Sequence, residues 1–150
     1  FIPEAVAAFT DQDRERLMQD SGIVRNKRKI DAAIANARAV IALRGALTAE
    51  ADAHRAGRMD EAPLAHLLRP RQSYPRHLGE LVWLYQPSQH PLPKNAGEVP
   101  AQTEESRALS AELKRRGFVF VGPVTALALM SAIGIVNTDI LGTWKRPLVE

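Results

Sequence analysis

The residues with the clearest chemical potential lie in one short segment, where two glycines enclose four apolar residues directly after a run of cations. Gly117 and Gly122 enclose the sequence FVFV, and Lys114, Arg115 and Arg116 precede them. Cationic side chains and the free N–H groups at the start of a helix both attract phosphate. The segment therefore suggests an anion site, and three interpretations of it compete.

The first interpretation is a phosphate-binding P-loop, because the glycines have the spacing G-x-x-x-x-G. That motif continues with Lys and then Ser or Thr, whereas Pro123 and Val124 follow here, so the P-loop is excluded. The second is a buried β-strand over FVFV, which four apolar and partly β-branched residues would fit. No partner strand is visible elsewhere in the sequence, and a lone strand leaves its backbone hydrogen bonds unmade.

The third interpretation is a clamp on the DNA backbone. The N–H groups of Gly122, Val124 and Thr125 would form an anion site at a helix N-terminus, and the cations would add charge one turn away. The DNA-binding residues predicted in this way are Lys114, Arg115, Arg116, Gly117, Gly122, Val124 and Thr125. A simple packing role for Phe118, Val121 and Phe120, which would join the two flanking helices, remains open as the alternative.

Helices are expected on both sides of this segment. Thr103 can cap a helix that runs to Arg116, with acidic residues in its first turn and cations in its last, as the helix dipole favours. Gly117 suits the position after the helix, and Pro123 suits the first turn of the next one. The run from Val124 to Ile133 is apolar on every side, which predicts a buried helix.

Two further helices are expected near the N-terminus. Thr10 and Asp13 form a variant capping box for a helix from Asp11 to about Ser21, which would bury Leu17 and Met18. A longer helix is expected from about Lys27 to Arg44, ended by Gly45, because its apolar residues recur at helical spacing. These stripe residues are Ile30, Ile34, Ala37 and Ile41.

The middle of the chain gives weaker signals. Short helices are expected near Ala49–Arg55 and Ala62–Leu68, and Leu78–Tyr85 (LGELVWLY) predicts a compact helix in the core. Four prolines between Gln86 and Ala101 predict an irregular loop.

Composition excludes several classes of protein. The 150 residues suit one domain, and 45% hydrophobic with 25% charged residues is ordinary for a globular chain. The absence of cysteine excludes a disulfide scaffold, a thiolate nucleophile and Cys-ligated metal within this sequence. A net charge of +3 is compatible with nucleic acid without arguing for it strongly. With no signal peptide and no apolar run approaching about 18 residues, we expect a soluble, cytoplasmic protein without a membrane role. The start at Phe1 leads us to expect a fragment.

Two blocks of sequence resemble one family. The stretch from Thr103 to Asn137, with KRRGFVFVGP at its centre, looks like the C-terminal signature of the DNA-3-methyladenine glycosylase I family, and Pro3 to Leu43 matches that family in content and order. The resemblance implies an all-α helix–hairpin–helix DNA glycosylase fold, present in part. It also implies one helical domain over residues 1–150, with an insertion at 46–77, where the sequence looks longer than the family's connection.

The same resemblance implies a function in base-excision repair. The complete protein would hydrolyse the N-glycosidic bond of 3-methyladenine in alkylated double-stranded DNA, without a lyase step. We expect no obligate protein partner and a cytoplasmic, nucleoid-associated location. The alternative is a non-catalytic DNA-binding or damage-sensing module that kept the clamp and lost the base pocket.

The sequence departs from the family in its catalytic and metal residues. The family's N-terminal segment, which carries the base-binding glutamate, the stacking aromatic residues and two zinc ligands, has no counterpart here. No catalytic residue can therefore be named. Asp139 and Thr143 stand where the family has its last His and Cys ligands, and since threonine is a poor zinc ligand we expect no zinc and no other cofactor.

Other residues of chemical interest have ordinary interpretations. The four histidines lack metal-ligand spacing and are expected in solvated loops; they are His54, His66, His77 and His90. Asp139 is expected as a helix cap or a surface charge, and Trp83 in the core, while Trp144 could be a packing or a stacking residue. A second basic cluster is expected to be a solvated helix end, and it consists of Arg25, Lys27, Arg28 and Lys29.

Overall fold

The computed structural model describes residues 2–143, and within that range every regular element is a helix. The α-helices are α1 (Pro3–Ala7), α2 (Asp11–Gln19), α3 (Lys27–Arg55), α4 (Leu78–Trp83), α5 (Glu104–Arg115) and α6 (Pro123–Ala132). Three single turns of 3₁₀ helix are η1 (Met59–Glu61), η2 (Ala65–Leu67) and η3 (Ala96–Glu98). The all-α fold class is as the sequence predicts, and FVFV forms no strand.

The chain forms two compact units. Unit 1 comprises Phe1–Leu81 with Leu113–Phe120, and unit 2 comprises Val82–Glu112 with Val121–Glu150. The single domain and the 46–77 insertion stay predictions from the sequence.

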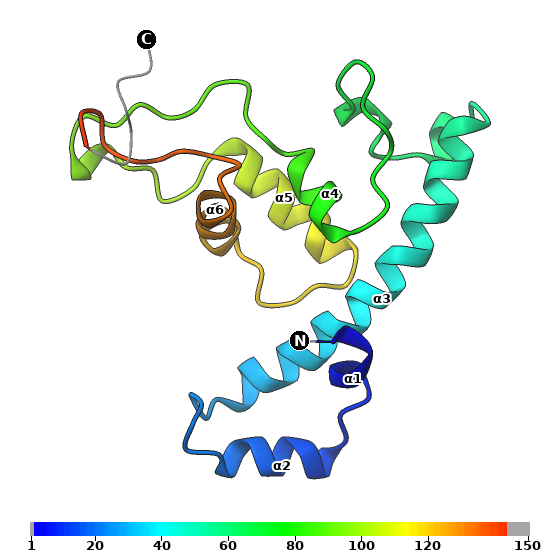
Figure 1. Ribbon diagram of the computed structural model, residues 1–150, viewed down its shortest axis with the longest axis vertical. Helices are drawn as coiled ribbons and strands as arrows, with labels where there is room; N and C mark the ends of the chain where they lie inside the picture. Colours follow the sequence, from blue (N-terminus) through cyan, green and yellow to red (C-terminus); the bar gives the residue numbers. More distant parts are fainter. Residues whose placement is uncertain (1, 144–150) are drawn as a thin grey trace. The chain divides into compact units, whose positions relative to one another are not determined.

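In unit 1, α1 and α2 pack on the N-terminal half of α3 (Figure 1). Their shared core consists of Val6, Ile30, Ile34 and Ala37, with Ala7, Phe9 and Leu17 partly buried against it. The predicted stripe on α3 is therefore confirmed for three of its four members. Ile41 is the exception and is exposed. Met18 on α2, which the sequence predicts to be buried, is exposed as well. Adjacent residues of a helix point about 100° apart, so Leu17 faces the core and Met18 does not.

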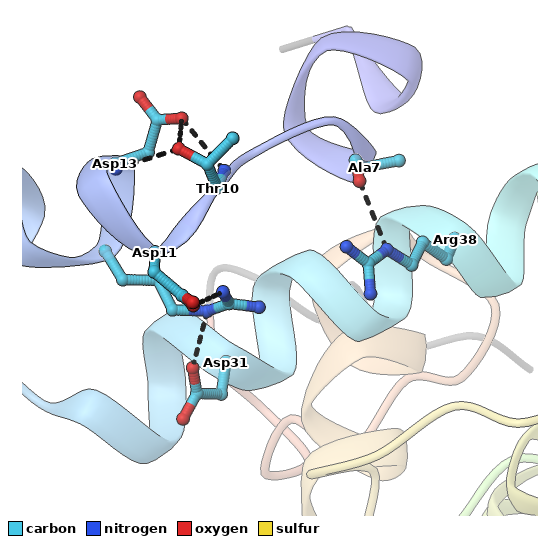
Figure 2. Close-up of polar contacts among 7 residues, drawn as sticks. Ala7, Thr10, Asp11, Asp13, Asp31 and Arg38 are labelled. Carbon is cyan, nitrogen blue, oxygen red and sulfur yellow. Dashed lines mark hydrogen bonds and ion pairs between the residues drawn. The ribbon is translucent and has the colours of Figure 1, made fainter.

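The capping box of α2 is confirmed (Figure 2). The Asp13 N–H donates to the Thr10 hydroxyl at 3.4 Å, and the Thr10 N–H donates to the Asp13 carboxylate at 2.9 Å. Two side chains then fasten these elements to α3. The Arg14 guanidinium lies 3.1 Å from the Asp31 carboxylate and also pairs with Asp11, and Arg38 donates to the Ala7 carbonyl at 3.1 Å.

α3 is longer than the sequence predicts. The expected end at Gly45 is wrong, because the helix continues to Arg55 and absorbs the separate helix expected at Ala49–Arg55. Glycine in a helix interior costs only about 1 kcal/mol. Leu43 and Leu47 lie on either side of Gly45 and are both buried. Their burial offsets that cost, so the helix continues past Gly45.

By length and composition alone, α3 is long and apolar enough to cross a membrane. A long core helix can have the same length and composition, and α3 buries eight residues, among them Ile34, Leu43 and Leu47. Its composition therefore gives only weak evidence of a membrane.

In unit 2, α6 and most of α5 each bury one face. The buried residues are Ser106, Leu109 and Ser110 on α5 and Ala126, Leu127 and Met130 on α6. The expectation that α6 is buried on every side is wrong, because Val124 and Leu129 are exposed. Because the helix is apolar on every side, the sequence does not indicate which face is buried.

The remaining segments match the sequence in part. The helix expected at Leu78–Tyr85 exists as α4, and the proline-rich segment after it is irregular apart from η3. Trp83, expected in the core, is 45% exposed, because Leu81 and Val82 take the inward positions of this short helix. Trp144 lies outside the described residues.

Candidate nucleic-acid interface

The predicted phosphate-binding residues begin in the last turn of α5. Thr103 directly precedes the helix. Its hydroxyl accepts from the Ser106 N–H at 3.2 Å, and the Ser106 hydroxyl accepts from the Thr103 N–H at 2.9 Å. Thr103 is therefore confirmed as the cap. At the other end, Lys114 and Arg115 are both exposed, and they add positive charge where the helix dipole is negative.

Gly117 ends α5 in a complete Schellman motif. The Gly117 N–H donates to the Lys114 carbonyl at 3.0 Å, and the Phe118 N–H reaches back to the Leu113 carbonyl at 3.0 Å. Gly117 has φ +86°, a left-handed backbone that favours glycine. Leu113 and Phe118 are both buried, so Phe118 is a packing residue, as one of the sequence interpretations had it.

The next predicted site residue, Arg116, points into unit 1. Its guanidinium donates two hydrogen bonds to the Glu50 carboxylate, at 3.0 and 2.9 Å, and only 6% of the side chain is exposed. The Tyr74 hydroxyl donates to the same carboxylate at 2.7 Å and accepts from the Leu64 N–H at 3.2 Å. Burial, with the hydrogen bond to Glu50, raises the pKa of Tyr74. Arg116 thus ties the end of α5 to α3 just before residues 117–122, called the hairpin below, while Lys114 and Arg115 are exposed.

The middle of the segment is held by a side chain of α3. The Val119 N–H donates to the Asn36 amide oxygen at 2.8 Å, and the Asn36 amide donates to the Val119 carbonyl at 3.0 Å. The following residue, Phe120, has φ +62° and a 58% exposed side chain. A left-handed backbone costs a residue other than glycine about 1–2 kcal/mol.

The second half of the segment belongs to unit 2. The Ser110 hydroxyl donates to the Val121 carbonyl at 2.6 Å. Gly122 then precedes α6 with an extended backbone and no side-chain cap, and Pro123 occupies the first turn as expected. The first N–H groups of a helix have no acceptor within it, and Val124 and Thr125 are exposed here.

The seven predicted residues are therefore divided between the two units. Lys114, Arg115, Arg116 and Gly117 lie in unit 1, and Gly122, Val124 and Thr125 lie in unit 2. Each group, taken alone, offers groups that attract an anion. Their joint role on DNA stays a prediction.

Sequence reasoning missed the residues that hold this segment: Asn36, Glu50, Tyr74 and Ser110. Three of them stand in helices, where a polar residue normally faces water, and Tyr74 lies in a segment of weak signal. Asn36, Glu50 and Tyr74 find their partners far away in the sequence, and Ser110 bonds to the segment beyond the end of its own helix.

The second basic cluster lies at the start of α3. Asn26 caps the helix by accepting from the Lys29 N–H at 3.2 Å, and all four cations are exposed. Of the histidines, His54 lies against the Tyr74 ring and His90 accepts from the Asn137 N–H at 3.3 Å. His77 forms an ion pair with Glu80 when it is protonated.

Asp139 and Thr143, the two positions compared with the family's zinc ligands, each form a hydrogen bond near the end of the described residues. The Thr143 hydroxyl donates to the Ile140 carbonyl at 2.8 Å, and a neutral hydroxyl is a poor zinc ligand. The Asp139 N–H donates to the Asn137 side chain at 2.9 Å, in a turn beyond α6. In the part of the chain that the structure describes, no three His, Cys, Asp or Glu side chains cluster closely enough to hold a metal.

Comparison with known proteins decides the family. The model of the methyladenine glycosylase family matches residues 1–66 and 65–146. The chain belongs to the methyladenine glycosylase family. The two matches meet inside the segment 46–77, where the family resemblance suggests an insertion.

Individual methyladenine glycosylases resemble the chain over nearly its whole length. The DNA-3-methyladenine glycosylase 1 of Escherichia coli is 33% identical over 149 residues, which are 98% of this chain. The DNA-3-methyladenine glycosylase of Haemophilus influenzae is 29% identical over 140 residues, or 91% of this chain. A crystal structure of 3-methyladenine DNA glycosylase I superposes with a TM-score of 0.70 and 31% identity, covering 97% of this chain and 65% of that one. The chain spans 65% and 60% of the lengths of the two curated relatives.

Proposed function

We propose that the protein to which this chain belongs is a monofunctional DNA-3-methyladenine glycosylase. It hydrolyses the N-glycosidic bond of 3-methyladenine in alkylated double-stranded DNA, the first step of base-excision repair. The observation that carries the proposal is the match to named DNA-3-methyladenine glycosylases over almost the entire chain. We extend the proposal to a cytoplasmic, nucleoid-associated location without an obligate protein partner.

The reaction needs little acid catalysis from the protein. Methylation at N3 leaves the adenine cationic, so the base departs as a neutral leaving group once the bond to the sugar breaks. The protein must turn the nucleotide out of the duplex, which costs a few kcal/mol and costs least for a damaged base. Binding and positioning then supply most of the rate enhancement.

In this proposal the chain contributes the grip on the DNA backbone. Lys114 and Arg115 supply charge to phosphate, and the N–H groups of Val124 and Thr125 supply hydrogen-bond donors. Gly117 provides the left-handed turn after α5, and Gly122 precedes α6 with an extended backbone. Arg116 supports the same grip from inside unit 1, through its ion pair with Glu50.

The experiment is release of free 3-methyladenine from methylated duplex DNA. The full-length product of the gene that contains this chain is compared with residues 1–150 alone. Release by the full-length protein, above an unmethylated control, supports the glycosylase. We expect residues 1–150 to bind duplex without releasing base, because no base-binding residue of the family has a counterpart in them.

The second candidate is a DNA-binding or damage-sensing module without catalysis. The misfit of Asp139 and Thr143 to the family's zinc site favours it. Salt-dependent duplex binding by the full-length protein, with no base release, would contradict the enzyme and support this module.

A further inference from the structure

Asn36 holds both backbone polar groups of Val119. Its amide oxygen accepts from the Val119 N–H at 2.8 Å, and its amide nitrogen donates to the Val119 carbonyl at 3.0 Å. One side chain thus provides what a neighbouring strand would provide to an extended residue. The two residues lie 83 positions apart and both belong to unit 1.

Phe120, the next residue, stands in a conformation that its own packing does not explain. A bulky residue with positive φ is uncommon, and Phe120 has φ +62°. The residue is 58% exposed, so burial of its side chain offsets little of the cost of this backbone. Side chains restrain both neighbours of Phe120, Asn36 at Val119 and Ser110 at Val121.

We propose that Asn36 is a positioning residue of the DNA-binding hairpin. By fixing Val119, it keeps Phe120 in the left-handed conformation, with its ring directed to solvent as an apolar contact for duplex DNA. The exposed cations Lys114 and Arg115 lie in the same unit and indicate the partner, because their charge complements the phosphate backbone. The inference rests on the proposed function, in which this hairpin grips DNA.

The first test compares Asn36→Ala with the wild-type chain in binding to a fluorescently labelled, undamaged duplex over a series of salt concentrations. We expect affinity to fall roughly tenfold while the slope of log affinity against log salt stays unchanged, because the contact that is lost is apolar and releases no counterions. The matched control is Asn95→Ala, which removes the same kind of side-chain bond to a backbone N–H, at Gly97 in unit 2. The control should bind like the wild type.

A second variant separates positioning from general stability. Glycine adopts positive φ without steric cost, so Phe120→Gly removes the need for Asn36 to hold the turn. Adding Asn36→Ala to Phe120→Gly should therefore cost much less affinity than adding it to the wild type. Thermal unfolding of each variant identifies the temperatures at which all of them are folded, and binding is compared there.

Equal losses of affinity in both backgrounds, or an unchanged affinity of Asn36→Ala, would overturn the inference and leave the proposed function standing. Failure of the wild-type chain to bind duplex even at low salt is a different result. It would contradict the proposed role of the hairpin, and the inference with it.

Discussion

Glu50 and Arg116 lie 66 positions apart in the sequence and form a two-pronged ion pair inside unit 1. The Glu50 side chain is 16% exposed and the Arg116 side chain 6% exposed, so water solvates neither charge well and each compensates the other. Removing one member of such a pair leaves an uncompensated buried charge. The pair makes the C-terminal half of α3 a support for the segment that follows α5.

The ion pair predicts that two adjacent arginines contribute very differently to the free energy of unfolding. Arg116→Ala should lower the free energy of unfolding by about 3–5 kcal/mol, because Glu50 loses its buried partner. Arg115→Ala, at an exposed position where ion pairs and hydrogen bonds contribute little, should lower it by less than about 1 kcal/mol. Urea denaturation followed by circular dichroism measures both. Equal stability of the two variants would show that the pair contributes nothing to the fold.

Tyr74 predicts a dependence of stability on alkaline pH. Burial, together with the hydrogen bond to Glu50, raises the pKa of the Tyr74 phenol above its ordinary value of 10.0. Above pH 10 the unfolded chain loses this proton while the folded chain keeps it. The contribution to stability is therefore complete below pH 10 and falls as pH rises further, by about 1.4 kcal/mol for each pH unit.

Tyr74→Phe provides the control for that effect. It should destabilise the fold at neutral pH by about 1–3 kcal/mol, because the buried Leu64 N–H loses its acceptor and Glu50 loses a donor. Its deficit relative to the wild type should shrink above pH 10. A deficit that stays constant between pH 8 and pH 11 would contradict the raised pKa.

The hairpin shows how far sequence reasoning reached. The Thr103 cap, the end of α5 at Gly117 and the start of α6 at Pro123 all follow from local signals, since each depends on residues within one or two turns. These signals locate the segment correctly. They do not show which cations face solvent, because Arg115 and Arg116 are equivalent in the sequence. Only the fold places Glu50 beside Arg116.

The same limit explains the errors elsewhere. Gly45 is a good helix terminator by local preference, yet the burial of Leu43 and Leu47 carries α3 past it. Asn36 looks like an ordinary polar position on an amphipathic helix, and only the fold brings it to Val119. Interactions between residues 83 positions apart leave no periodicity in a single sequence.

Two glycines predict opposite responses to the same substitution. Gly45→Ala should stabilise the protein by about 0.5–1 kcal/mol, because Gly45 is an exposed position in the interior of α3 with open space around an added methyl group. Gly117→Ala should destabilise it by about 1–2 kcal/mol, since its φ of +86° strains any L-residue although space is open there too. Thermal unfolding of the pair makes the comparison, and stabilisation by Gly117→Ala would contradict the left-handed turn.

Arg115 predicts the clearest effect on DNA. If its guanidinium contacts a phosphate, Arg115→Ala should weaken duplex binding roughly tenfold at low salt and reduce the slope of log affinity against log salt by about 1. Arg107→Ala is the matched control, an exposed arginine on the same helix about two turns earlier. Both variants lose one positive charge, so a general effect of net charge would lower both affinities alike. A phosphate contact at the hairpin lowers only that of Arg115→Ala, and fluorescence anisotropy over a salt series distinguishes the two results.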